Sequence, residues 1–180
     1  MNTPRIAFVA YPSKDSPALP VIREGIAKAN SQTNQIRFKP WEFNDVVGTP
    51  VISPIIEQIC ESAFVVADIS LLNLNVVYEI GYAIGKKKRV FLIRHIGTRD
   101  DWDLAKRVGI FDTLGYFEYK NADDLSHRIS NYIVDTPLDF SSEIDTKAPA
   151  YVIEPPQKGD AATLMTSRLK KARYRYRSFN

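Results

Sequence analysis

Glu79 is the residue of this chain whose type and position most clearly point to chemistry. It lies in a stretch where apolar residues such as Val76 and Ile80 recur at helical spacing, so a charged group is out of place there. An ionised carboxylate that faces a ligand can attack an electrophilic carbon or stabilise positive charge developing on it. The helix dipole is expected to keep this carboxylate ionised at neutral pH. The structural alternative is an acid of the first helical turns that the same dipole favours.

Asp68 is a second carboxylate close to Glu79 in the sequence. It ends the apolar run 64–67, which is typical of a strand buried on both faces of a parallel sheet. Because ligands bind at the carboxyl ends of such strands, we expect Asp68 to line the same pocket as Glu79 and to assist a leaving group. Asp68 could instead hold Ser70 and the following loop in place, and Asp15 or Asp45 could be the acid.

A strand, loop, helix and strand positions these two carboxylates. The run 64–67 is the first strand of this unit, and Asn73 or Asn75 can cap the helix that follows. Three lysines close that helix, and a second apolar run follows them, which predicts a right-handed βαβ unit. Gly81 and Gly85 each cost about 1 kcal/mol in a helix interior. We therefore expect another backbone or a ligand to approach the helix at these glycines.

The rest of the chain repeats the alternation of apolar strand runs with helical periodicity. This pattern predicts an α/β fold, with a five-stranded parallel sheet, helices on both faces and a flavodoxin-like or Rossmann-like arrangement. We expect the strand order 2-1-3-4-5. The predicted strands are 6–10, 36–39, 64–67, 90–93 and 116–119, and a short helix is predicted at 102–108.

Polar and aromatic side chains follow the first two predicted strands, at the edge where Asp68 lies. Ser13, Lys14 and Asp15 could contact a phosphate or ribose, or could form a turn that caps the next helix. Trp41 could stack on a base or pack under its loop. The predicted substrate-binding residues are Tyr11, Ser13, Lys14, Asp15, Trp41, Asp45, Asn75, Tyr78 and Tyr82.

The stretch from Asp68 to Gly85 resembles two related groups of proteins. Its E-x-G-x-A segment resembles the helix that carries the nucleophilic glutamate of nucleoside 2-deoxyribosyltransferases. Its longer pattern is closer to D-[IL]-[ST]-x-x-N-x-N-V-x-Y-E-x-G, found in bacterial TIR-like nucleotide-processing domains. The loop from Tyr11 to Asp15 also resembles the TIR Tyr-Ser-x-x-Asp loop, and it departs from the Ala-Gly-Pro of the transferases. The nine matching positions are Asp68, Ile69, Ser70, Asn73, Asn75, Val76, Tyr78, Glu79 and Gly81.

This resemblance implies cleavage or transfer at the N-glycosidic bond of a nucleoside or nucleotide. Glu79 would attack or stabilise the anomeric carbon, Asp68 would assist the departing base, and Tyr78 and Tyr82 would orient Glu79 or stack on the base. A carboxylate under the sugar suits this chemistry, because the transition state resembles an oxocarbenium ion. Two alternatives stay open: a TIR-like enzyme that cleaves NAD, and a non-catalytic module that binds a nucleotide signal and assembles.

Composition excludes several other classes of protein. One cysteine and two histidines rule out an internal disulfide and a multi-cysteine or histidine-rich metal site. No glycine-rich phosphate-binding motif is present, so we predict no cofactor and no metal. No apolar run is long enough to cross a membrane, and the first residues lack the pattern of a signal peptide. We therefore expect a cytoplasmic protein without membrane contact.

The last part of the chain differs from the rest. We divide the sequence into an α/β domain at 1–140 and a linker with a basic arm, or the start of a further domain, at 141–180. The proline-rich stretch 135–159 is predicted as linker, followed by a helix and a strand. Six cations and no acid lie between Arg168 and Arg177; the whole chain is +3, which leaves −3 on residues 1–167. We expect this arm to dock on a neighbouring subunit of a homo-oligomer, and nucleic acid could bind only there.

Overall fold

The computed structural model describes residues 3–12, 16–43, 52–98, 114–131, 150–153, 160–172 and 176–179. The chain divides into two compact units, residues 1–138 and 139–180. The predicted helix at 102–108 lies outside the described residues. Within those that are described, no helix combines the length and the apolar character needed to cross a membrane.

The first unit is an α/β sheet, as predicted. All four strand pairings are parallel, and the order β2-β1-β3-β4-β5 confirms the order expected from the sequence. The elements are β1 (Arg5–Ala10), α1 (Leu19–Gln32), β2 (Ile36–Pro40), the 3-10 helix η1 (Trp41–Phe43), α2 (Ile52–Glu61), β3 (Phe64–Asp68), α3 (Leu74–Gly85), β4 (Arg89–His95), β5 (Tyr116–Tyr119) and α6 (Ala122–Ser130).

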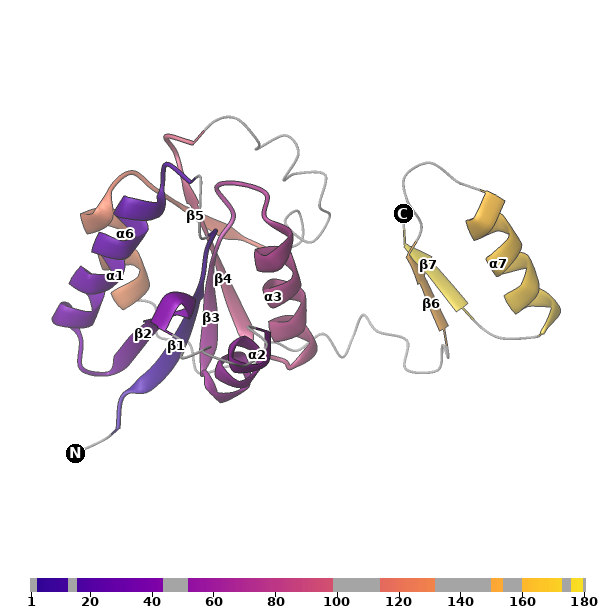
Figure 1. Ribbon diagram of the computed structural model, residues 1–180, viewed down its shortest axis with the longest axis horizontal. Helices are drawn as coiled ribbons and strands as arrows, with labels where there is room; N and C mark the ends of the chain where they lie inside the picture. Colours follow the sequence, from indigo (N-terminus) through magenta and orange to yellow (C-terminus); the bar gives the residue numbers. More distant parts are fainter. Residues whose placement is uncertain are drawn as a thin grey trace. The chain divides into compact units, whose positions relative to one another are not determined.

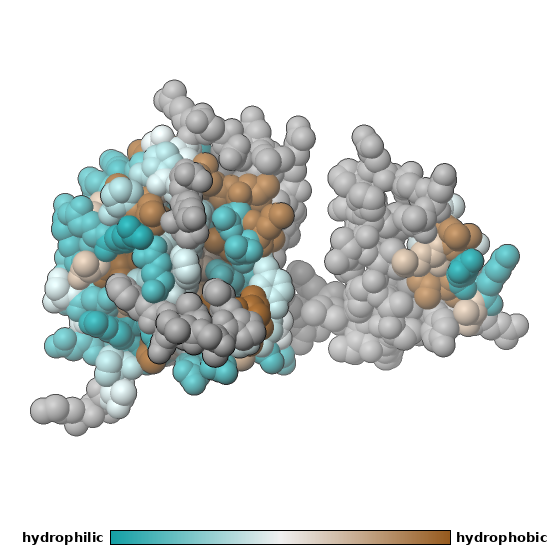
Figure 2. All heavy atoms as spheres, in the orientation of Figure 1, coloured by the Kyte–Doolittle hydropathy of each residue, from teal (hydrophilic) through white to brown (hydrophobic). Residues whose placement is uncertain are grey.

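Helices cover both faces of this sheet, with α1 and α6 on one side and α2 and α3 on the other (Figure 1). Two buried apolar clusters fill the two interfaces. Successive strand residues point to opposite faces, so Val9 belongs to the first cluster and its neighbour Phe8 to the second. Every residue of β3 is buried, as expected for the central strand. The face seen in Figure 2 is mostly hydrophilic over α1 and α6, and apolar residues gather toward α2 and α3.

At the edge strand β2, a side chain forms hydrogen bonds with part of the outward-facing backbone. Ile36, Phe38 and Pro40 are buried whereas Arg37 is exposed, a pattern typical of the sheet edge at which the expected strand order places this strand. The Asn30 side chain of α1 donates a hydrogen bond to the Phe38 carbonyl (2.9 Å) and accepts one from the Phe38 amide (2.8 Å). This amide therefore mimics a neighbouring strand and protects the edge from pairing with another chain.

Helix α3 begins and ends with recognisable caps. Asn73 is the N-cap, because its side-chain oxygen accepts hydrogen bonds from the amides of Asn75 (3.0 Å) and Val76 (3.2 Å). Lys87, just past the C-terminus, takes a left-handed backbone with φ 57°. Gly81 is exposed, and a Cβ added at Gly81 or at Gly85 would meet nothing within 4 Å. No backbone of the described residues therefore packs closely against these glycines, and the predicted approach of a ligand stays a prediction.

The second unit is a small βαβ unit. Strands β6 (Ala150–Ile153) and β7 (Tyr176–Phe179) pair in parallel, and α7 (Asp160–Lys171) connects them. The helix and strand predicted after the linker are present, but β6 lies in the stretch that was predicted to be linker. Four apolar or β-branched residues are too short a run to be recognised between prolines. On α7, Leu164 and Met165 are both exposed.

Candidate functional site

A cavity of about 390 Å³ opens at the carboxyl edge of the sheet. Its walls come from the residue after β1, from η1 and from the N-terminal turns of α2 and α3. This is the edge at which open parallel sheets bind ligands. The lining residues are Tyr11, Trp41, Ile52, Ile55, Asn73, Asn75, Val76, Tyr78 and Glu79.

Glu79 is the only charged group among these lining residues. Its side chain is 6% exposed, and it forms no hydrogen bond or ion pair with any described residue. Burial raises the pKa of this carboxyl from 4.5 to about 7. Glu79 is the sixth residue of α3, beyond the first turn where the helix dipole acts, so loss of water dominates. Burial therefore opposes the ionised form that the helix dipole was expected to favour.

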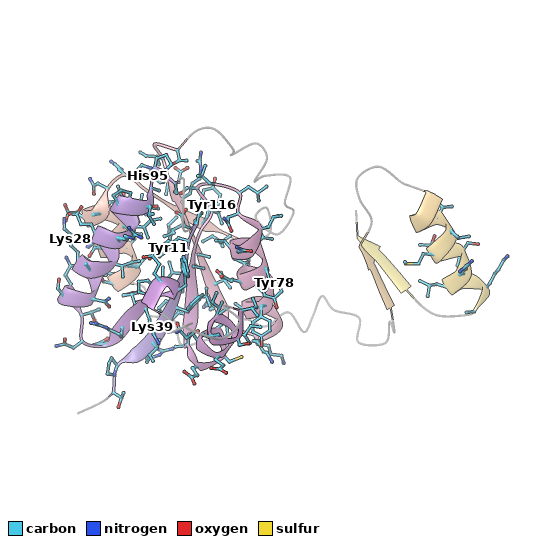
Figure 3. All side chains as sticks on the ribbon, in the orientation of Figure 1. Tyr11, Lys28, Lys39, Tyr78, His95 and Tyr116 are labelled. Atoms are coloured by element: carbon cyan, nitrogen blue, oxygen red, sulfur yellow. The ribbon has the colours of Figure 1, made fainter. Side chains whose placement is uncertain are left out.

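Two aromatic side chains form a fixed wall of the cavity. The Trp41 ring nitrogen donates a hydrogen bond to the Tyr11 carbonyl (3.1 Å), and the two rings meet edge to face with centroids 6.4 Å apart. Trp41 also packs against both apolar clusters, so it contributes to the core and lines the cavity at once. Burial, and then the charge of nearby Glu42, raises the pKa of Tyr11 above its usual range. Tyr11 lies against the sheet in Figure 3.

Tyr78 and Tyr82 lie one turn apart on α3. Their rings stack with centroids 6.3 Å apart, and Tyr78 is 49% exposed at the mouth of the cavity (Figure 3). The Tyr82 hydroxyl lies 3.5 Å from the Cys60 sulfur, and the Lys86 ammonium lies 5.5 Å from the Tyr82 ring centre. Tyr82 is not among the lining residues, and it adjoins the site through its stacking on Tyr78.

Asn73 is a lining residue that was not predicted to bind a ligand. Its oxygen caps α3, while its amide nitrogen forms no hydrogen bond with a described residue and can donate to a ligand. The signal that could have identified it is its position immediately before α3 and after a buried strand. The apolar residues Ile52, Ile55 and Val76 were also missed, because an apolar side chain in a helical pattern is first assigned to the core.

Asp68 lies elsewhere, within the sheet. It is fully buried and does not line the cavity. Its carboxylate accepts hydrogen bonds from the Ser70 amide (3.2 Å), the Ser70 hydroxyl (2.8 Å) and the Tyr119 hydroxyl (2.9 Å). Burial raises the pKa of Asp68 to about 6, although the donors from Ser70 and Tyr119 lower it in part. The two carboxylates predicted to share a pocket are thus in different environments.

The remaining predicted site residues cannot be placed against the cavity. Ser13, Lys14, Asp15 and Asp45 lie outside the described residues. No group of three or more metal-binding side chains occurs in the part of the chain that the structure describes.

No model of a known protein family matches this sequence, and no curated protein matches it. Among solved structures, a conserved protein from Enterococcus faecalis V583 is similar, with a TM-score of 0.51 and 15% identity over 70% of this chain and 97% of that chain. A CMP N-glycosidase from Clostridium botulinum gives a TM-score of 0.47 and 15% identity over 71% of this chain and 100% of that chain. A diflavin flavoprotein from Nostoc sp. gives a TM-score of 0.39 and 11% identity over 72% of this chain and 95% of that chain. At this identity the similarity concerns the fold alone.

Proposed function

We propose that this protein cleaves or transfers the N-glycosidic bond of a nucleoside or nucleotide, with the Glu79 carboxylate at the sugar. The observation that carries the proposal is the state of Glu79: a buried carboxylate without a protein partner, facing a cavity with aromatic walls. A buried carboxyl with a strongly raised pKa is destabilising, and such groups are concentrated at functional sites. The residue pattern around Glu79 in the sequence supports the same chemistry.

The carboxylate can act in two related ways. As the bond between the anomeric carbon and the base nitrogen breaks, its electron pair leaves with the base and positive charge develops on the sugar. Glu79 either stabilises that charge or forms a bond to the anomeric carbon, which water or a second base then breaks. Both roles need the ionised form of Glu79. In a cavity with few competing water molecules, its interaction with the sugar is stronger than in bulk solvent.

The other lining groups suit the two halves of such a substrate. The cavity volume of about 390 Å³ is within the range of small-ligand sites. Trp41 and Tyr78 offer aromatic surfaces to a base, and Trp41 is held in place by its hydrogen bond to Tyr11. Asn73 and Asn75 offer amide groups to sugar hydroxyls.

A substrate panel tests the proposal. The purified protein is incubated separately with deoxyribonucleosides, ribonucleosides, ribonucleotides and NAD, and free base is measured by chromatography, with and without a second base as acceptor. We expect release of base from at least one nucleoside or nucleotide. Release of nicotinamide alone would replace the proposal with NAD cleavage. Binding of a nucleotide by calorimetry without any release would indicate a non-catalytic module.

A further inference from the structure

Asp68 is the centre of a hydrogen-bond network that joins three strand ends. Tyr119, which ends β5, and Ser70, two residues after β3, both donate to its carboxylate. The Ser70 oxygen in turn accepts a hydrogen bond from the His95 amide at the end of β4 (2.7 Å). The Ile69 amide donates to the Ile93 carbonyl (2.9 Å), which extends the pairing of β3 and β4 by one step. Figure 3 shows His95 at this edge of the sheet.

The network fixes one end of the loop that leads to the cavity. The loop starts at Ile69 and Ser70, which the network holds, and finishes at Asn73, whose side chain caps α3. Only two residues lie between Ser70 and Asn73, so a shift of Ser70 moves the cap. Asn73 lines the cavity, and the helix that it starts carries Glu79. Hydrogen bonds to Ser70 and a short stretch of backbone therefore link the Asp68 carboxylate to the cavity wall.

We propose that Asp68 is a positioning residue: its hydrogen bonds with Ser70 and Tyr119 hold the loop 69–73 so that Asn73 and the start of α3 face the substrate, and it does not protonate the leaving base. This inference rests on the proposed function for its catalytic consequence. Its structural part, the holding of the loop, stands independently.

The groups that face Asp68 agree with this role. The Asp68 carboxylate already accepts three hydrogen bonds. Two come from the amide and hydroxyl of Ser70 in the loop, and one comes from the hydroxyl of Tyr119 on β5. No Lys, Arg or His side chain of the described residues bonds to it. The His95 ring packs against the Tyr119 ring, with centroids 5.3 Å apart. The His95 ring nitrogens contact the Thr98 hydroxyl and the Lys120 carbonyl, so the His95 ring is held in place beside Tyr119. A general acid needs a free path to its substrate, whereas the Asp68 side chain is fully buried and does not line the cavity.

Hydrogen exchange of the full chain tests the structural part. Tyr119→Phe removes one donor to Asp68 and keeps the ring. We expect the amides of Ser70, Asn75 and Val76 to exchange about tenfold faster, since a hydrogen bond to a charged group contributes enough for that factor. Ser126→Ala is the matched control, because it removes one buried hydroxyl bond, to Gln32 (2.7 Å), on the α1 and α6 face. Unchanged exchange at the three amides in Tyr119→Phe would overturn the proposal.

A leaving-group comparison tests the catalytic part. Asp68→Asn and Ser70→Ala are measured on a purine nucleoside and on its N7-methylated form, whose base leaves without being protonated. A positioning role predicts that each variant loses about tenfold to a hundredfold in base release, by the same factor on both substrates. If Asp68→Asn is impaired on the unmethylated substrate only, Asp68 is the acid and the proposal is wrong. If the wild-type protein releases no base, the proposed function fails while the exchange result still decides the role of the network.

Discussion

The Glu79 side chain combines two properties that oppose each other. Burial raises its pKa from 4.5 to about 7, which corresponds to about 3 kcal/mol of lost stability when it is ionised. The same loss of water makes the carboxylate more basic. Because no described residue bonds to it, it is available to interact with positive charge on a ligand, as the proposed function requires. A fold optimised only for stability would place an apolar residue at this position.

The pH dependence of folding follows from the direction of this shift. The folded-state pKa lies above the unfolded-state value, so the folded protein binds more protons between about pH 4.5 and 7 and its stability falls as pH rises through that window. Asp68 acts in the same direction from about pH 4 to 6. We expect urea unfolding to give a lower free energy of unfolding at pH 8 than at pH 5.

The variant Glu79→Gln isolates the contribution of this residue. It should remove about 2.5 kcal/mol of the loss between pH 5 and pH 8, because the neutral amide does not titrate. Glu57→Gln, at an exposed position on α2, is the control and should retain the pH dependence of the wild type. Equal pH dependence in Glu79→Gln and the wild type would show that Glu79 is not buried as described.

The residue that caps helix α3 also contributes to the candidate site. Asn73 caps this helix and also lines the cavity, whereas Asn121 caps α6 through its hydrogen bond from the Asp124 amide (2.9 Å), away from the cavity. Replacing either cap by alanine should cost about 1 kcal/mol of stability. Asn73→Ala should in addition lower base release, and Asn121→Ala should not. Thermal unfolding and chromatography of both variants measure this; equal activities would remove Asn73 from the site.

Sequence patterns predicted the strands of the first unit well, because β1, β3 and β4 contain apolar runs and β2 alternates between buried and more exposed residues. Its helices were recognisable because each keeps an apolar stripe. Glu79 was identified for the same reason, as a charge interrupting such a stripe. The partner of Asp68 was not predictable, since Tyr119 is 51 residues away and only the β4 and β5 pairing brings it close. The strength of burial at Glu79 was also hidden, because the cavity that it faces is lined by residues far apart in the sequence, such as Tyr11, Trp41 and Ile55.

The two units divide the charge of the molecule unevenly. The run of six cations lies wholly in the second unit, while the first unit has its own five-stranded sheet and both apolar clusters. A chain shortened to end near Ser141 should therefore stay folded, with cooperative unfolding. If residues 142–180 form an assembly arm, light scattering should report a smaller species than for the full chain. An unchanged oligomeric mass would make a further domain or a nucleic-acid-binding extension the better interpretation of the cations.

Base release by Glu79→Gln at pH 8 decides whether the Glu79 carboxylate acts in the reaction. At this pH most of the wild-type carboxylate is ionised, and the amide keeps its shape while losing its charge. We expect release of free base from the best substrate of the panel to fall at least about a hundredfold, with Glu57→Gln unchanged. The wild-type rate should also rise with pH through about 7, since the ionised form reacts. A Glu79→Gln variant that releases base at the wild-type rate would contradict the account.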